Sequence, residues 1–286
     1  MSNKLLICTD LDRTLIPNGP QPESPMARQY FLKFAERPEV VLAYVSGRHR
    51  KLVKKAIFNY ILPKPDFVIG DVGTTIYHVG ESQDWQRQLE WEDRIAIDWG
   101  GKSHADLKSI LNDITVLRLQ EPSKQNNFKL SYYVPLYANR EALDDLIGHR
   151  FNHAGVKASL AWSVDEPAGV GLLDILPAHA SKFHAIMALM KVHGFDYSNT
   201  IFCGDSGNDI EVLVSPIPAV LVGNSQPDVR ELAILLAREN RLTDQLYIAK
   251  GDFAGMNGNY SAGMLEGIAH YHPQTLEWME LDTGDK

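Results

Sequence analysis

Short apolar runs recur along the chain and predict buried β-strands. The runs are nearly continuous rather than alternating, which is typical of parallel strands covered on both faces. They occupy residues 5–9, 40–45, 67–69, 200–203 and 219–222. Apolar residues at helical spacing fill the segments 24–36 and 48–62, and each segment ends near a proline. This alternation of strand and helix predicts an α/β fold built on a doubly wound parallel sheet.

A different pattern begins after Gly73 and predicts an inserted α+β domain. Only two good helical segments interrupt it, at 105–112 and 139–152. The segments that look like strands are 74–79, 114–119, 128–134, 157–164 and 170–176. Many strands with few helices favour an open antiparallel sheet that has its helices on one face. A helix over 181–192, with Gly194 as its stop, returns the chain to the first pattern.

The two patterns predict two domains. Residues 1–79 and 177–286 would form a Rossmann-like core domain, and residues 80–176 would form an inserted cap domain. A chain of 286 residues is long enough for two unequal domains. Hydrophobic residues make up 44% of it, which is ordinary for a globular protein.

Charge and cysteine content narrow the functional classes. The formal net charge of -8 argues against a surface that binds nucleic acid, because such a surface is usually basic. Cys8 and Cys203 have no paired spacing for zinc or for a disulfide framework, so we expect a reducing, cytoplasmic location. No uncharged run is long enough to span a bilayer, and we expect no membrane partner.

Two acidic clusters follow predicted strands and would meet at one edge of the sheet, where open α/β sheets bind ligands. Asp10 and Asp12 are two apart in an extended segment, so they could face one reacting group as nucleophile and proton donor. Oxygen ligands from Asp10, Asp205 and Asp209, with a backbone carbonyl, suit Mg²⁺, and Asp12 is included among the predicted metal ligands. Asp205 and Asp209 could also cap the next helix, and the two roles are compatible.

Phosphate would need cations and amides near these carboxylates. Ser46, Gly47 and Arg48 end the second strand and offer a hydroxyl and backbone amides to a phosphoryl oxygen. Lys182 begins the later helix, and its ammonium could neutralise the aspartate and the phosphate. Taken alone, the first group could be an ordinary turn and Lys182 an exposed helix residue.

Together these motifs resemble the haloacid dehalogenase superfamily of phosphohydrolases, and the position of the insertion resembles the C2-type cap of that superfamily. The motifs are Asp10 to Thr14, Ser46, Lys182 and Gly204 to Asp209, in that order. Within the superfamily the chain looks like the sucrose-phosphate and mannosylfructose-phosphate phosphatases. The segments that carry this likeness are Phe128 to Tyr132, Leu173 to Pro177 and Cys203 to Ile210.

The resemblance implies Mg²⁺-dependent hydrolysis of a sugar phosphate, such as sucrose 6-phosphate or a related disaccharide phosphate. An aspartyl-phosphate would form at Asp10, and Asp12 would protonate the leaving oxygen and later activate water. The resemblance further implies substrate-binding roles for Thr14, Gly47, Arg48 and Asn208. It also suggests a sugar-phosphate synthase of the same pathway as a partner.

Two departures from the family pattern stand out. Gly73-Thr74-Thr75-Ile76 replaces the Gly-Ser-Glu pattern of the sucrose-phosphate phosphatases and is nearer the Gly-Thr form of the mannosylfructose enzyme. Arg13 stands where glycine or asparagine is commoner.

In the cap domain, we predict that Lys129 and Tyr132 share a strand face that looks toward the core domain and reads the sugar. Tyr133 and Trp162 are further candidates, although only one of the adjacent tyrosines can face the site. Each of these residues, taken alone, is more often structural than ligand-binding.

Two other functions compete with a sugar-phosphate phosphatase. A phosphomutase would share the aspartyl-phosphate step but would return the phosphoryl group to bound sugar. A non-catalytic scaffold is disfavoured because every expected chemical group is present.

Overall fold

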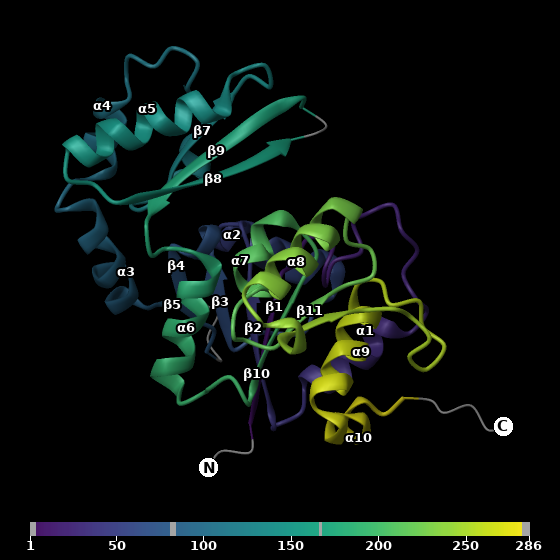
Figure 1. Cartoon of the computed structure of the whole chain (residues 1–286). Coiled ribbons are helices and arrows are strands. Elements are labelled where there is room, and N and C mark those ends of the chain that lie inside the picture. The colour runs from purple at the N-terminus through teal and green to yellow at the C-terminus, as the bar shows by residue number, and fades with distance from the viewer. Residues whose placement is uncertain (1–3, 81–83, 166–167, 282–286) are drawn as a thin grey trace.

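The computed structural model describes residues 4–80, 84–165 and 168–281 and contains two β-sheets (Figure 1). The larger sheet has eight strands in the order β12-β11-β10-β1-β2-β3-β4-β5. These are β1 (Leu5–Thr9), β2 (Val40–Val45), β3 (Phe67–Gly70), β4 (Thr75–His78), β5 (Gln86–Arg87), β10 (Thr200–Gly204), β11 (Ala219–Leu221) and β12 (Leu246–Ile248). The six strands from β12 to β3 are parallel, and β4 and β5 continue the sheet as antiparallel strands.

Helices cover both faces of the larger sheet, which confirms the predicted α/β fold. One face carries α1 (Ala27–Ala35), α2 (Arg50–Tyr60), α9 (Ser261–Tyr271) and α10 (Leu276–Met279), and the other carries α3 (Leu89–Ala96), α6 (Lys182–His193), α7 (Ile210–Leu213) and α8 (Pro227–Glu239). Within β1, Leu5 and Ile7 enter the first apolar cluster, whereas Leu6 and Cys8 enter the second. The continuous apolar run therefore reflects burial on both faces.

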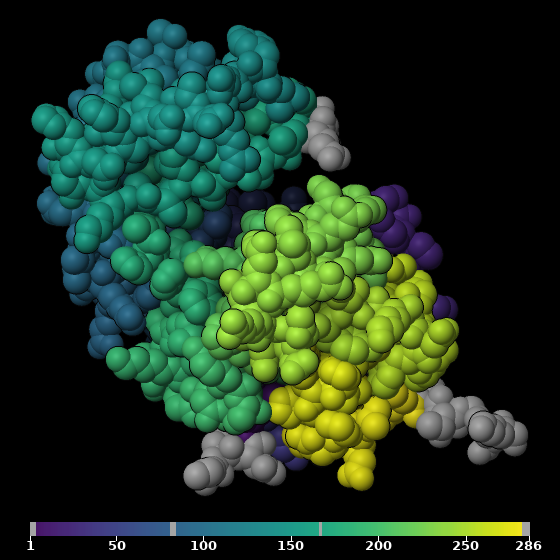
Figure 2. Space-filling model, in the orientation of Figure 1, coloured from purple at the N-terminus to yellow at the C-terminus, as the bar shows by residue number. Residues whose placement is uncertain are grey.

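The smaller sheet has four antiparallel strands in the order β6-β7-β9-β8. They are β6 (Arg118–Leu119), β7 (Leu130–Val134), β8 (Ala158–Asp165) and β9 (Val170–Pro177). The helices α4 (His104–Ile110) and α5 (Arg140–His153) pack on one face of this sheet, around Leu107, Ile147 and Leu173. This is the α+β arrangement that the insertion predicts, and Figure 2 shows a hollow between this part and the rest of the molecule.

The segment after Gly73 departs from one expectation. Strand β4, predicted with the inserted segments, pairs with β3 in the larger sheet, and β5 pairs with β4. Helix α3 also packs on the larger sheet through Trp91 and Ile95. The larger sheet thus holds the chain as far as Ala96, and the domain limits at 79–80 and 176–177 stay a prediction.

Two segments connect the larger sheet to the smaller one, and they touch each other. His179, after β9, donates its backbone N–H to the Asp98 carboxylate, which follows α3, over 2.8 Å. Among the described helices, none has both the length and the apolar character needed to cross a membrane.

Candidate active site

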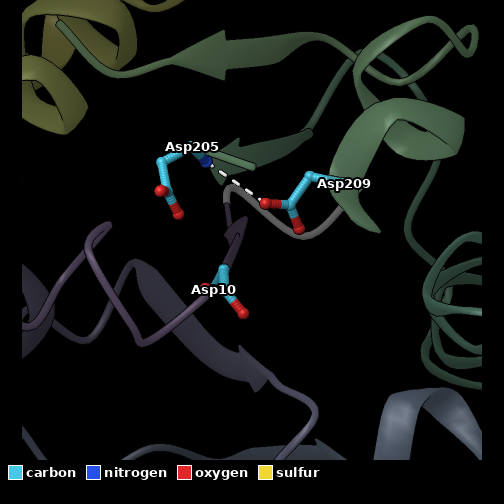
Figure 3. Close-up of side chains that lie close together, drawn as sticks. All are labelled: Asp10, Asp205 and Asp209. Carbon is cyan, nitrogen blue, oxygen red and sulfur yellow. Dashed lines mark hydrogen bonds between the residues drawn. The ribbon is translucent and has the colours of Figure 1, made fainter. Parts of the chain in front are cut away.

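Three buried aspartates converge at the carboxyl edge of the larger sheet (Figure 3). Asp10 follows β1, and Asp205 and Asp209 follow its neighbour β10. The backbone N–H of Asp10 donates to the carbonyl oxygen of Cys203 over 2.9 Å, so the strand pairing continues up to the site. One oxygen from each carboxylate lies within 4.8 Å of the others, which is close enough for one metal ion to bind all three.

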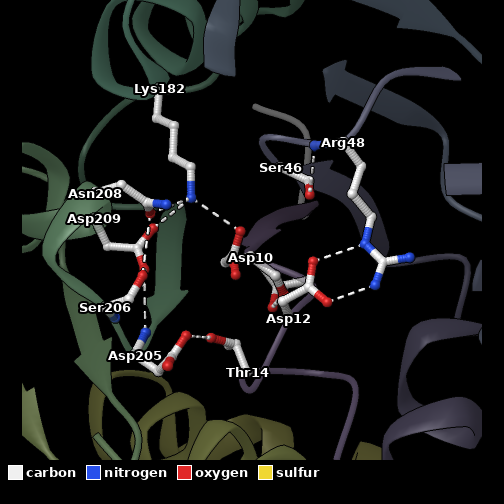
Figure 4. Close-up of polar contacts among 11 residues, drawn as sticks. Asp10, Asp12, Thr14, Ser46, Arg48, Lys182, Asp205, Ser206, Asn208 and Asp209 are labelled. Carbon is white, nitrogen blue, oxygen red and sulfur yellow. Dashed lines mark hydrogen bonds and ion pairs between the residues drawn. The ribbon is translucent and has the colours of Figure 1, made fainter. Parts of the chain in front are cut away.

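Lys182 joins this cluster from the first turn of α6 (Figure 4). Its Nζ donates to Asp10 Oδ1 at 2.9 Å, to Asp209 Oδ1 at 2.7 Å and to Asn208 Oδ1 at 2.8 Å. Burial by itself would lower the pKa of Lys182, but the charges of Asp10 and Asp209 outweigh it and raise the pKa above its ordinary value. Lys182 is therefore a buried ammonium and not an exposed helix residue.

One ammonium does not balance three carboxylates. Burial raises the pKa of Asp10 to about 8, and repulsion from Asp209 and Asp205 adds to this effect against the attraction of Lys182. Burial and Asp209 likewise raise the pKa of Asp205 to about 7. The chemistry of this donor set fits a divalent cation, because added positive charge would stabilise buried carboxylates that repel one another.

Asp209 also organises the loop that carries it. Its Oδ2 accepts hydrogen bonds from the backbone N–H groups of Asp205 at 3.2 Å and Ser206 at 3.1 Å, and from Ser206 Oγ at 3.1 Å. A side chain at Gly204 would lie 2.7 Å from Asp209 Cγ, so this close approach requires glycine. The N-cap residue of this turn is Ser206 and not Asp205, whereas Asp209 is the third residue of the capping box and still has Oδ1 free to accept from Lys182.

Asp12 faces away from the three-aspartate cluster and toward Arg48. Arg48 donates from Nε to Asp12 Oδ2 at 2.7 Å and from Nη2 to Oδ1 at 2.5 Å, and Asn18 donates to Oδ1 at 2.7 Å. Burial would raise the pKa of Asp12, but the hydrogen bonds and charge of Arg48 outweigh it and lower the pKa below its ordinary value. The Asp12 carboxylate lies outside the group of three side chains that could share a metal, so the predicted place of Asp12 among the metal ligands stays a prediction.

Thr14 and Arg13 act on Asp205. Thr14 is fully buried, and its Oγ1 donates to Asp205 Oδ1 over 2.9 Å. The Thr14 side chain therefore does not contact the substrate, contrary to the prediction. Arg13 adopts a left-handed backbone with φ of 61°, and its Nε lies 3.7 Å from Asp205 Oδ2. Arginine at this position therefore adds a cation beside the cluster.

The Ser46 loop rests on a strained neighbour that the sequence did not point out. Asp71, Val72 and Gly73 have consecutive φ values of 52°, 61° and 97°. Val72 N–H donates to the Ser46 carbonyl oxygen at 3.2 Å, and Arg48 N–H donates to Ser46 Oγ at 3.2 Å. A Cβ at Gly73 would lie 2.5 Å from the backbone just before Lys182, so this turn holds the Ser46 loop against the start of α6.

A cleft of about 350 Å³ opens above these groups. The larger-sheet side contributes predicted residues, namely Asp10, Asp12, Ser46, Gly47, Arg48, Asp205 and Asn208. On the other side, strands β8 and β9 contribute Trp162 and Asp174, and the segment between β6 and β7 contributes Gln120, Lys124 and Lys129. Lys129 is buried and its Nζ lies 3.4 Å from Asp174 Oδ2. Gln120 and Lys124 escaped prediction because nothing in their sequence neighbourhood marks them, whereas Asp174 lies in one of the family-like segments.

Tyr132 does not line the cleft, and its predicted role is wrong. Lys129 and Tyr132 are three positions apart, so strand alternation turns them to opposite faces. Tyr132 is buried in the apolar cluster under α4 and α5. Tyr133 donates its hydroxyl to Glu121 and lies outside the cleft as well.

The fold and the site are those of a phosphatase of the haloacid dehalogenase type. The features that define this class are the larger sheet, the inserted cap and the aspartate–lysine cluster at the sheet edge. The comparison with protein families is more specific. A family model described as sucrose-6F-phosphate phosphohydrolase matches residues 3–272, so the chain belongs to that family.

Relatives and solved structures agree with this membership. A Nitrosococcus oceani protein, whose name places it among the HAD-like hydrolases, is 52% identical over 280 residues, which are 98% of this chain and 75% of that protein. The mannosylfructose-phosphate phosphatase of Agrobacterium fabrum is 26% identical over 93% of this chain and 96% of its own. A sucrose-phosphatase structure from Synechocystis sp. PCC6803, in complex with sucrose and phosphate, matches with a TM-score of 0.71 and 26% identity, covering 94% of this chain and 98% of that one. The chain spans 54% of the length of the tobacco sucrose-phosphatases that it also matches.

Proposed function

We propose that this chain is a Mg²⁺-dependent phosphatase that uses Asp10 to hydrolyse sucrose 6-phosphate or a related disaccharide phosphate. The observation that carries the proposal is the contact of Lys182 with Asp10, which lines the cleft, and with Asp209 just behind it. A buried ammonium of this kind both orients the attacking carboxylate and reduces its repulsion of a phosphate dianion.

Asp10, Asp205 and Asp209 would hold the Mg²⁺ ion. When bound, it would neutralise charge on the phosphoryl oxygens and help to orient the phosphoryl group. Thr14, through its hydrogen bond to Asp205, would fix one of these carboxylates in place.

The covalent chemistry would be carried by the two aspartates. A carboxylate oxygen of Asp10 attacks phosphorus as the bond to the sugar oxygen breaks, and Asp12 gives that oxygen its proton. Water then attacks the aspartyl-phosphate, its proton passes to Asp12, and the bond between phosphorus and Asp10 breaks. Inorganic phosphate leaves with both aspartates restored. Arg48 holds Asp12 by two hydrogen bonds and favours its anion, which is the form that accepts the proton of water and not the form that donates in the first step.

The polar wall of the cleft supports a sugar substrate. Gln120, Lys124, Lys129 and Asp174 offer amide, ammonium and carboxylate groups to sugar hydroxyls, and Trp162 offers an aromatic face to the sugar ring. The matched structure that holds sucrose and phosphate, and the matched mannosylfructose-phosphate phosphatase, support a disaccharide phosphate.

Phosphate release tests this proposal. We expect Mg²⁺-dependent release from sucrose 6-phosphate or mannosylfructose phosphate that exceeds release from hexose phosphates, and we expect Asp10→Asn to abolish it while the protein stays folded. Activity of Asp10→Asn within tenfold of the wild type would exclude this nucleophile. Sugar-phosphate isomerisation without free phosphate would instead identify a phosphomutase.

A further inference from the structure

A second cavity, of about 700 Å³, lies beside the junction of the two sheets and shares no lining residue with the active-site cleft. Helices α3 and α6 form its sides, on the left of Figure 1 below the smaller sheet. The two connecting segments also contribute to it, through Asp98 and His179. Its volume falls within the range of small-molecule sites in proteins.

The walls of this cavity are largely apolar. They are formed by Trp91, Ile95, Met187, Met190, Phe195 and Tyr197. Met187 and Phe195 are partly exposed although they pack against the apolar core, so they offer apolar surface to the cavity. Aromatic rings and flexible thioethers suit a flat apolar group, and they offer little to the hydroxyls of a sugar.

Cations surround these walls. Arg94, Lys157 and Lys191 all line the cavity and are exposed, and none has a salt-bridge partner among the described residues. The lining also carries two carboxylates, since Asp98 accepts from His179 and Asp196 accepts from Ser198, so three cations against two carboxylates leave a formal charge of +1 with the histidines neutral. In a protein of net charge -8, three unpaired cations around one apolar cavity form a local site of positive potential.

We propose that this cavity binds a small organic anion that has a flat apolar body, independently of the active site. The apolar body would pack between Trp91 and Met187, and the anionic group would face Arg94 and Lys191. An inorganic anion alone would gain little here, because it would leave the apolar walls uncovered.

The probe is 1-anilinonaphthalene-8-sulfonate, which joins an aromatic body to a sulfonate. We expect one saturable site by fluorescence titration, with binding that persists in Asp10→Asn and in the presence of Mg²⁺ and inorganic phosphate. The double variant Arg94→Ala/Lys191→Ala should weaken the Kd roughly fivefold to tenfold, because two partly exposed charge pairs are lost. Met187→Trp, which places a larger ring where the apolar body would pack, should weaken binding.

The matched control removes one lysine and one arginine from other exposed helix positions, in the variant Lys108→Ala/Arg238→Ala. It should leave the Kd unchanged, and all variants should keep the wild-type melting temperature within a few degrees. Absence of saturable binding, equal Kd values in both double variants, unchanged binding in Met187→Trp, or displacement by inorganic phosphate would overturn the proposal.

Discussion

Replacement of Lys182 by methionine separates the electrostatic role of this residue from its bulk. The side chains are similar in length, but methionine cannot donate the three hydrogen bonds to Asp10, Asn208 and Asp209. The variant leaves three buried carboxylates with no ammonium among them. We therefore expect a loss of folding stability in the absence of metal as well as a loss of activity.

The size of the stability loss follows from burial. Removal of one partner from a buried ion pair typically costs about 3–5 kcal/mol. Protonation of Asp10, whose pKa burial raises to about 8, limits this cost at low pH. A raised carboxylate pKa means that the free energy of unfolding falls as pH rises toward that pKa. The difference in the free energy of unfolding between wild type and variant should therefore grow from pH 6 to pH 9. A loss of this size lowers the melting temperature by roughly 10 °C in a protein of this length.

The assay is thermal unfolding in chelator at several pH values, followed by Mg²⁺ titration. Lys191→Met, an exposed position on the same helix, is the control and should change little. The variant Lys182→Met should gain more stability from Mg²⁺ than the wild type does, since the fixed ammonium no longer opposes the ion. Asp209→Asn should lower the folding stability less in Lys182→Met than in the wild type. Equal melting temperatures for Lys182→Met and Lys191→Met would refute this account of the cluster.

Three further predictions concern the metal, the sugar and the proton. Asp205→Asn should raise the Mg²⁺ concentration needed for half-maximal phosphate release at least about tenfold, because one charged ligand is lost; an unchanged titration would move the metal site elsewhere. Lys129→Met should lower kcat/KM for the preferred disaccharide phosphate about tenfold to a hundredfold, but it should leave kcat/KM for a small aryl phosphate unchanged. Equal losses on both substrates would assign Lys129 to packing. Tyr132→Ala should instead lower the melting temperature, because it removes core volume. Arg48→Ala should raise the pKa of Asp12, measured by carbon-13 NMR of its carboxyl group, because only Asn18 and Lys182 would then oppose the effect of burial. A titration midpoint that does not move would exclude Arg48 as the cause.

The sequence predicted the parts of the fold that depend on local pattern. The runs at 5–9 and 40–45 coincide with β1 and β2, because strands buried on both faces must be apolar throughout. The approach of Asp10 to Asp205 and Asp209 was predictable too, since neighbouring parallel strands bring their carboxyl ends together. The pattern change after Gly73 groups 74–79 with the inserted strands although the predicted core domain runs to residue 79, because the pattern of an antiparallel strand does not name the strand it pairs with.

Side-chain partners were less predictable. The pairing of Arg48 with Asp12 joins residues 36 positions apart, and no periodicity encodes which carboxylate a guanidinium will meet. The three left-handed residues from Asp71 to Gly73 were equally hidden, because Asp71 and Val72 adopt a backbone that their residue types seldom choose. Such strain persists only where surrounding contacts impose it, and here the Ser46 loop and the start of α6 impose it.

Charge balance in the cleft supports the proposed dependence on a cation. The lining has five carboxylates, on Asp10, Asp12, Asp71, Asp174 and Asp205, and four permanent cations, on Arg13, Arg48, Lys124 and Lys129. Asp209 and Lys182, just behind, add one charge of each sign. The cleft is thus slightly negative before a phosphate dianion arrives, and burial together with the neighbouring carboxylates raises the pKa of both Asp10 and Asp205. A divalent ion held at those two residues would reverse the sign of the site where the phosphate must bind, while Arg48 and Lys129, farther along the lining, remain for the rest of the substrate.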